Sequence, residues 1–147
     1  TNIKLHLIGK LQTNKVKFAI NLFDYIHSLD NEKLAKKIAD EEFKQKKKVK
    51  IFIQVNIGNE KQKSGINTEN LESFYNYCIE LNLDIVGLMC IPPIGYNSEN
   101  FFKEMNILTK KLNFKELSMG MSSDYINATK NHSTYLRIGS AIFGNRN

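Results

Sequence analysis

Short apolar runs alternate with helical periodicities along the whole chain. Most of the runs are rich in β-branched residues, and they cover residues 3–8, 25–29, 49–55, 84–88, 115–119 and 135–138. Between the runs, apolar residues recur at i, i+3, i+4 and i+7, as in the stretch from Leu71 to Cys78, which is the pattern of an amphipathic helix. The run from Ile51 to Ile53 is apolar on both faces, as a buried parallel strand is. The alternation predicts βαβ units around a parallel sheet of about six strands.

Six βα units are too few for a closed barrel of eight strands, which takes about 250 residues. The sheet is therefore either open and doubly wound, or part of a TIM (β/α) barrel. Because the chain opens directly on the first apolar run, we expect an α/β fold of the second kind, an incomplete TIM barrel that lacks its first two βα units. With 147 residues, 41% of them hydrophobic, the chain 1–147 is expected to form a single domain around its own core.

The second predicted helix and the lysines that follow it explain much of the chain's charge. We expect Asp30 to cap this helix, and Ala35, Ala39 and Phe43 to form its apolar stripe. The helix should end in the lysine-rich run 44–50, where positive charge favours the negative end of the helix dipole. The net charge of +6 comes almost entirely from lysine, whereas arginine is preferred for bidentate contacts with bases and phosphates. We therefore expect no nucleic-acid partner.

The apolar runs and the two cysteines limit the cellular setting. No run approaches the roughly 18 apolar residues of a membrane span, so we expect no membrane association. Cys78 and Cys90 are too far apart for a CxxC motif, and no matching set of histidines and cysteines predicts a zinc site. Both are interpreted as packed free thiols, which indicates the reducing cytoplasm.

The C-terminal end carries the pattern with the clearest chemistry. Residues 118–124 (SMGMSSD) and 137–144 (RIGSAIFG) each read as a buried strand end that turns, through glycine and a hydroxyl residue, into a helix. Two such turns on adjacent parallel strands bring free backbone N–H groups and two positive helix ends to one point, which suits a phosphate. In (β/α) barrels, a phosphate site commonly lies after strands seven and eight. We therefore predict a phosphorylated small-molecule ligand here.

A series of motifs in fixed order resembles a known family. The chain is similar to the YggS/PROSC-type pyridoxal-phosphate homeostasis family, which is related to the N-terminal barrel of alanine racemase. The resemblance extends almost from end to end. It is carried by His6–Lys15 (HLIGKLQTNK), Ile26–Asp30 (IHSLD), Ile53–Asn56 (IQVN), Glu60 with Lys63–Gly65, Gly87–Met89 with Ile91–Pro93, and the two C-terminal segments.

The resemblance implies a barrel that binds pyridoxal 5'-phosphate (PLP) at its C-terminal face. By motif, the phosphate would be held by Met121, Ser122, Gly139 and Ser140, and Arg137 would face the pyridine nitrogen. The family has no established catalytic turnover and is thought to buffer PLP or deliver it to PLP-requiring apo-enzymes. Its lysine that binds PLP covalently lies on the first strand, upstream of Thr1, so the chain resembles the last three quarters or less of a member.

Further hypotheses concern a substitute lysine and other functions. Lys63 follows a strand end and is the candidate for covalent attachment in place of the missing lysine. One alternative function is a barrel-type PLP-dependent amino-acid racemase, although an arginine cannot protonate the pyridine nitrogen, and this disfavours carbanion chemistry. Others are a barrel enzyme acting on a sugar or indole phosphate, and a truncated remnant that binds nothing. His6, His27 and His132 are interpreted as structural or exposed, because nothing in the sequence places them in contact.

Overall fold

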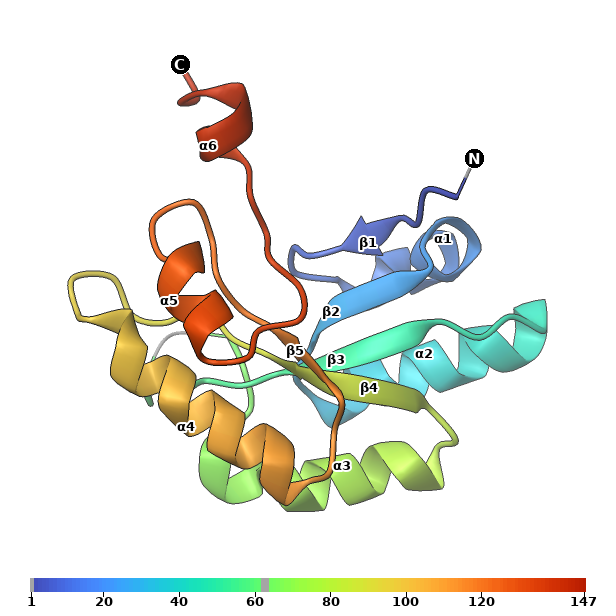
Figure 1. Cartoon of the computed structure of the whole chain (residues 1–147). Coiled ribbons are helices and arrows are strands. Elements are labelled where there is room, and N and C mark those ends of the chain that lie inside the picture. The colour runs from blue at the N-terminus through green and yellow to red at the C-terminus, as the bar shows by residue number, and fades with distance from the viewer. Residues whose placement is uncertain (1, 62–63) are drawn as a thin grey trace.

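The chain folds as a half-barrel of five parallel strands with helices on its outer face (Figure 1). The computed structural model describes residues 2–61 and 64–147. The strands, in the spatial order β1-β2-β3-β4-β5, are β1 (His6–Leu7), β2 (Tyr25–Leu29), β3 (Lys50–Gln54), β4 (Asp84–Met89) and β5 (Glu116–Ser118). The connecting helices are η1 (Thr13–Lys15), α1 (Val16–Leu22), α2 (Glu32–Gln45), η2 (Thr68–Asn70), α3 (Leu71–Glu80) and α4 (Ser98–Lys111). Two short helices, α5 (Tyr125–Lys130) and α6 (Ser140–Phe143), follow β5.

Two separate sets of buried side chains lie on the two faces of this sheet. The main core packs between the strands and the outer helices, and it includes Ile26, Ile51 and Leu88. Phe52 is also fully buried but lies outside that cluster, because it stacks on His27. The inner face of the half-barrel therefore carries aromatic and polar side chains, whereas the outer face carries the aliphatic core. Within residues 2–61 and 64–147, no helix is long and apolar enough to cross a membrane.

Helix α2 forms where its sequence predicts it. Of the predicted stripe, Ala35 is buried and Ala39 packs against the core, but Phe43 does not. Phe43 is 87% exposed, and the buried apolar residues of the helix are Leu34, Ala35 and Ile38. The prediction that Asp30 caps the helix is also wrong. The Asn31 side chain accepts the Leu34 N–H at 2.8 Å, whereas the Asp30 carboxylate accepts the Gly65 N–H at 3.0 Å and so joins two loops.

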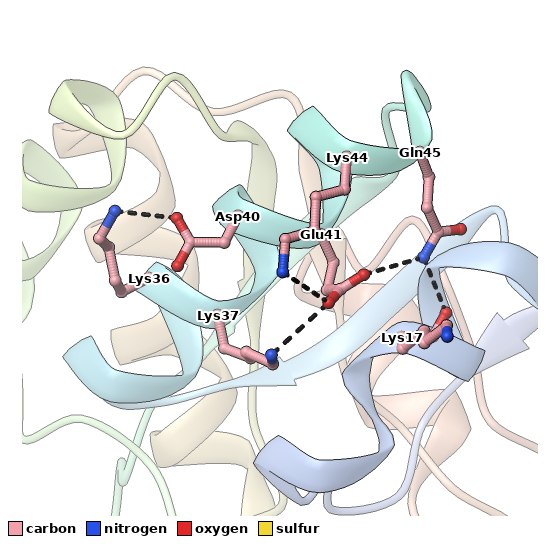
Figure 2. Close-up of polar contacts among 7 residues, drawn as sticks. All are labelled: Lys17, Lys36, Lys37, Asp40, Glu41, Lys44 and Gln45. Carbon is pink, nitrogen blue, oxygen red and sulfur yellow. Dashed lines mark hydrogen bonds and ion pairs between the residues drawn. The ribbon is translucent and has the colours of Figure 1, made fainter.

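Gln45 links α2 to α1 (Figure 2). Its side-chain amide donates to the carbonyl of Lys17 at 3.0 Å and to the carboxylate of Glu41 at 3.3 Å. Gln45→Ala is expected to lower the free energy of unfolding by about 1 kcal/mol, because the Lys17 carbonyl loses its donor. Urea unfolding measures this, with Lys36→Ala as the control, since that variant removes only the exposed Lys36–Asp40 pair. Equal effects of the two variants would contradict the prediction.

The lysine run after α2 binds the carbonyl ends of neighbouring elements. Helix α2 ends at Gln45, as the sequence predicts, and Lys46 caps it in the left-handed conformation with φ of 52°. The Lys47 ammonium group donates to the carbonyls of Asn21 and Phe23 at the end of α1. Lys48 donates to the carbonyl of Asn82 after α3. These lysines therefore satisfy carbonyls at helix C-termini, in agreement with the dipole argument.

The sixth predicted strand, residues 135–138, is absent from the sheet. The segment runs beside β5 and forms one isolated bridge, between Ser118 and Tyr135, with backbone bonds from the Met119 N–H to the Tyr135 carbonyl and from the Arg137 N–H to the Gly120 carbonyl, but it does not continue as a regular ladder. Side-chain hydroxyls just before it take over bonds that a strand ladder would use. Thr134 Oγ1 accepts the Leu117 N–H at 2.8 Å, and Ser133 Oγ donates to the Met119 carbonyl at 2.6 Å. This competition by Ser and Thr side chains explains why an apolar run that follows them stays irregular.

Candidate functional site

A cavity of about 970 Å³ opens on the inner side of the half-barrel. All five residues that the sequence analysis assigns to a phosphate or a pyridine nitrogen line this cavity. They come from the loop after β5 and from the C-terminal segment that leads into α6. The lining includes His6, His27, Met121, Ser122, Arg137, Gly139 and Ser140. The structure therefore brings the predicted residues of both C-terminal segments to one cavity.

Arg137 forms the cationic wall of this cavity. Its Nη1 donates to Ser118 Oγ at 2.8 Å, and its Nη2 donates to the carbonyl of Cys90 at 2.8 Å. Burial lowers the pKa of Arg137, but a guanidinium remains protonated in proteins. Among residues 2–61 and 64–147, no carboxylate lies within 4.0 Å of the guanidinium. A partly buried cation without an acidic partner suits a ligand that brings an acceptor atom or a negative charge.

The two C-terminal loops meet at Ser122. Its hydroxyl oxygen accepts the Ala141 N–H at 3.1 Å, which ties the loop after β5 to the start of α6. In the described part of the chain, the backbone N–H groups of Ser122, Gly139 and Ser140 have no protein acceptor. A phosphate needs such a group of free N–H donors. The cradle therefore fits a phosphate.

Met121 lies at this cradle but does not offer a free backbone donor. Its N–H donates to the Asp124 carboxylate at 2.8 Å, and its side chain lines the cavity. Asp124 thus organises the turn after β5, as expected for an acidic residue at the start of a helix rather than for a general base. Any contact between Met121 and a ligand would come from its thioether side chain.

Two histidines belong to the same site, although no sequence pattern predicts their contact. His6 Nδ1 and His27 Nε2 are 2.9 Å apart, and His27 Nδ1 is 2.8 Å from Ser118 Oγ. A continuous hydrogen-bonded chain therefore runs from His6 through His27 and Ser118 to Arg137. The available signal was the alternation along β2, because Tyr25 and His27 share one face of the strand. His27 and Ser118 are 91 positions apart, and only the fold brings them together.

Aromatic rings hold the two histidines in place. His6 stacks on Tyr25 with the ring centroids 4.1 Å apart and the planes at 10°, and His27 stacks on Phe52 at 4.3 Å and 19°. Tyr135 packs edge-on against His27 and Phe52. Ring stacking on both histidines fixes their orientation, so their nitrogens are preorganised for hydrogen bonds.

The buried His27 predicts a marked sensitivity to acid. Burial lowers the pKa of His27 from 6.5 to about 3, with further lowering by His6 and Arg137. Below pH 6.5 His27 binds a proton in the unfolded chain but not in the folded chain. The free energy of unfolding should therefore fall by about 1.4 kcal/mol for each unit by which the pH is lowered. We expect a loss of about 2 kcal/mol between pH 6.5 and pH 5, measured by urea unfolding at each pH. His27→Gln should flatten that slope and the exposed His132→Gln should not; equal slopes would contradict the assignment.

Other candidate residues lie apart from the cavity or outside the described residues. Lys63 falls in the short stretch that the structure does not describe, so its proposed role in covalent attachment stays a prediction. Cys78 and Cys90 are buried free thiols, as predicted. Burial raises the pKa of each thiol to about 12, which keeps both unreactive.

Comparison with known proteins places the chain among PLP-related proteins. Residues 2–147 match the family model of the alanine racemase N-terminal domain. The pyridoxal phosphate homeostasis protein of Aquifex aeolicus is 39% identical over 155 aligned positions, which cover 99% of this chain and 68% of that protein. The protein of the same name from Haemophilus influenzae is 37% identical, with 99% and 66% covered. The chain therefore spans about two thirds of the length of these relatives.

Solved structures resemble the half-barrel as a whole. PipY from Synechococcus elongatus with PLP bound superposes with a TM-score of 0.89 at 30% identity, covering 98% of this chain and 72% of PipY. PipY without PLP gives a TM-score of 0.87. Alanine racemase of Clostridium difficile gives 0.71 at 16% identity, covering 99% of this chain and 41% of the racemase, which shows a shared fold alone.

Proposed function

We propose that this chain, which belongs to the pyridoxal phosphate homeostasis protein family, binds PLP and turns over no substrate. One observation carries the proposal. The partly buried guanidinium of Arg137 has no carboxylate partner in the described part of the chain, and it lines the same cavity as the loop contact between Ser122 and Ala141. A cation and a cradle of free N–H groups in one cavity match the pyridine nitrogen and the phosphate of a single PLP molecule.

The phosphate would lie between the two C-terminal loops. We assign its hydrogen bonds to the N–H groups of Ser122, Gly139 and Ser140 and to the hydroxyl of Ser140. The side chain of Met121, which has no donor, would pack beside the phosphate. The Gly139 position supports this, because a Cβ added there meets nothing within 4 Å, which leaves room for a phosphate oxygen. The hydroxyl of Ser122 already holds the loops together through Ala141, so its own role is to set their spacing.

Arg137 would donate a hydrogen bond to the pyridine nitrogen. Bound PLP supplies an aldehyde and an electron-accepting ring, and the strength of that ring as an electron acceptor depends on protonation of its nitrogen. A guanidinium does not release its protons in proteins, so Arg137 would leave the nitrogen unprotonated. Ser118 and the Cys90 carbonyl orient the guanidinium for this contact. A weak electron acceptor fits storage or transfer of PLP better than carbanion chemistry.

The same reasoning extends to the rest of the barrel and to partners. The structure has five strands, and we propose that the extended segment at Tyr135 stands for a sixth of the eight positions in a barrel, which two further βα units would close. We propose that the chain is the part of the barrel that binds PLP, and that it acts in the reducing cytoplasm, where its buried thiols stay free. PLP-requiring apo-enzymes would be the recipients of the bound cofactor.

A matched pair of ligands tests the proposal without interference from surface lysines. Pyridoxine 5'-phosphate has the ring and phosphate of PLP but no aldehyde, so it cannot react with amines, and pyridoxine lacks the phosphate as well. We expect saturable binding of one pyridoxine 5'-phosphate per chain by equilibrium dialysis, and at least about 100-fold weaker binding of pyridoxine. Equal affinity for the two ligands, or no saturable binding of either, would refute the proposed function.

A further inference from the structure

The hydrogen-bonded chain of four residues in the cavity wall has a direction that can be worked out atom by atom. It starts at Arg137, whose guanidinium has five N–H donors and no acceptor. Ser118 Oγ must therefore accept the bond from Arg137 Nη1, which is 2.8 Å long. That bond uses one lone pair of the hydroxyl oxygen and leaves its hydrogen still to be placed.

Burial settles where the hydrogen of Ser118 points. The residue is fully buried, and the only other polar side-chain atom that contacts its hydroxyl in the described part of the chain is His27 Nδ1 at 2.8 Å. If His27 donated instead, the Ser118 hydroxyl would accept twice and its hydrogen would be buried without an acceptor. Such an unpaired group disfavours that arrangement by about 5- to 150-fold. Ser118 therefore donates to His27 Nδ1.

The direction then passes through both imidazoles. Burial keeps His27 neutral, because it lowers the pKa of the ring to about 3. A neutral ring that accepts at Nδ1 carries its hydrogen on Nε2, so His27 donates to His6 Nδ1 across 2.9 Å. Burial also lowers the pKa of His6, which favours the neutral ring there. His6 consequently carries its own hydrogen on Nε2.

The last donor of the chain faces the cavity. His6 lines the cavity, and its Nε2 has no hydrogen-bond partner among residues 2–61 and 64–147. The ring cannot turn freely, because it stacks on Tyr25 with the planes at 10°. A fixed N–H group without a partner, on a residue that lines a binding cavity, favours a ligand oxygen that accepts a hydrogen bond over a group that donates one.

We propose that Arg137, through Ser118 and His27, sets the tautomer of His6, and that His6 Nε2–H is a ligand-binding donor for an oxygen substituent on the ring of the bound cofactor. The direction of the chain stands independently of any ligand, whereas the contact with the ring oxygen rests on the proposed function. Arg137 would thus have two roles in the cavity, one direct and one through a histidine on the first strand. Ser118 and His27 are positioning residues in this scheme.

Long-range ¹H–¹⁵N NMR of the ligand-free protein tests the direction. The chain has three histidines, so His6→Gln and His132→Gln assign every ring. We expect His6 and His27 both to be neutral at pH 7.5, with unprotonated Nδ1 and protonated Nε2. A protonated Nδ1 on either ring in the unmodified protein would overturn the proposal, whatever the variants do.

Two variants separate the role of Arg137 from a general loss of packing. Arg137→Met removes the donor that sets the direction, so both tautomers of His27 and His6 should become populated. Ser28→Ala is the matched control, because Ser28 is a buried hydroxyl on the same strand as His27 that has no partner among the described residues. It should leave both histidine spectra unchanged. Unchanged tautomers in Arg137→Met would show that Arg137 does not set the direction.

Addition of pyridoxine 5'-phosphate tests the ligand contact. The His6 Nε2 resonance should shift on saturation, whereas that of the exposed His132 should not, and His6→Phe should weaken binding by about 2- to 10-fold. Saturable binding that leaves the His6 resonance in place would disprove the contact. If dialysis finds no binding, the proposed function fails and the contact with it, while the tautomers of the ligand-free protein still decide the direction of the chain.

Discussion

Replacing Arg137 with methionine is expected to weaken binding of PLP and of pyridoxine 5'-phosphate by about 10- to 100-fold. A hydrogen bond from a charged donor in a buried site contributes about that much to affinity. The variant removes the donor that we propose for the pyridine nitrogen, and it also leaves the Ser118 hydroxyl and the Cys90 carbonyl without the bonds that they accept from the guanidinium. Methionine keeps much of the length of the side chain, so the cavity should not collapse. Equilibrium dialysis of the two ligands measures the change.

The other arginine of the chain provides the control for charge. Arg146 also lines the cavity, but it makes no hydrogen bond or ion pair with another described residue. Arg146→Met removes the same formal charge and is expected to change affinity by less than about threefold, because an exposed charge is screened by salt. If the two variants weakened binding equally, the effect of Arg137 would be a general attraction of the cavity for anions. The assignment of Arg137 to the pyridine nitrogen would then be wrong.

Local periodicity predicted the elements well, because each strand and helix is encoded over a few residues. The strand at Ile51–Ile53 and the helical stripe of Leu71, Phe74 and Cys78 are both buried as the pattern requires. The predicted stripe on α2 was wrong at Phe43, because the sequence of the helix allows two apolar faces. Ala35 belongs to both, and the fold buries the one with Leu34 and Ile38 and leaves Phe43 in solvent. Periodicity alone cannot choose between two faces that share a residue.

In the candidate site, too, the sequence predicts local features and misses those that depend on the fold. The meeting of the two C-terminal loops at one cavity was predictable, because glycine and serine at a strand end are a local signal and both loops follow the last two apolar runs. The sixth strand was not, because hydroxyls of Ser133 and Thr134 take the bonds of a regular ladder. The hydrogen-bonded chain through the two histidines could not be predicted from sequence, for a different reason. Its links join β1, β2 and β5, and which inner-face residues meet across a barrel depends on register and curvature that no single strand encodes.

Gly87 connects the stability of the sheet to the geometry of the site. It pairs with Glu116 in the ladder between β4 and β5, and a Cβ added at Gly87 would lie 2.0 Å from the Glu116 carbonyl oxygen and 2.6 Å from its carbonyl carbon. Both atoms belong to the backbone, so no side chain can move away to make room. The two strands would have to separate, and they carry the Cys90 carbonyl and the Ser118 hydroxyl that hold Arg137.

Gly87→Ala is therefore expected to lower the free energy of unfolding by about 3 kcal/mol or more, and the melting temperature by about 10 °C. Gly9 is the control position, because a Cβ added there meets nothing within 4 Å. Gly9→Ala should thus stay within about 0.5 kcal/mol of the unmodified chain in urea unfolding. Because the strands that separate are the ones that orient Arg137, the folded fraction of Gly87→Ala should also bind pyridoxine 5'-phosphate more weakly. A Gly87→Ala protein with unchanged stability would mean that β4 and β5 can shift apart at little cost, and the rigidity assumed for Arg137 would then lose its structural basis.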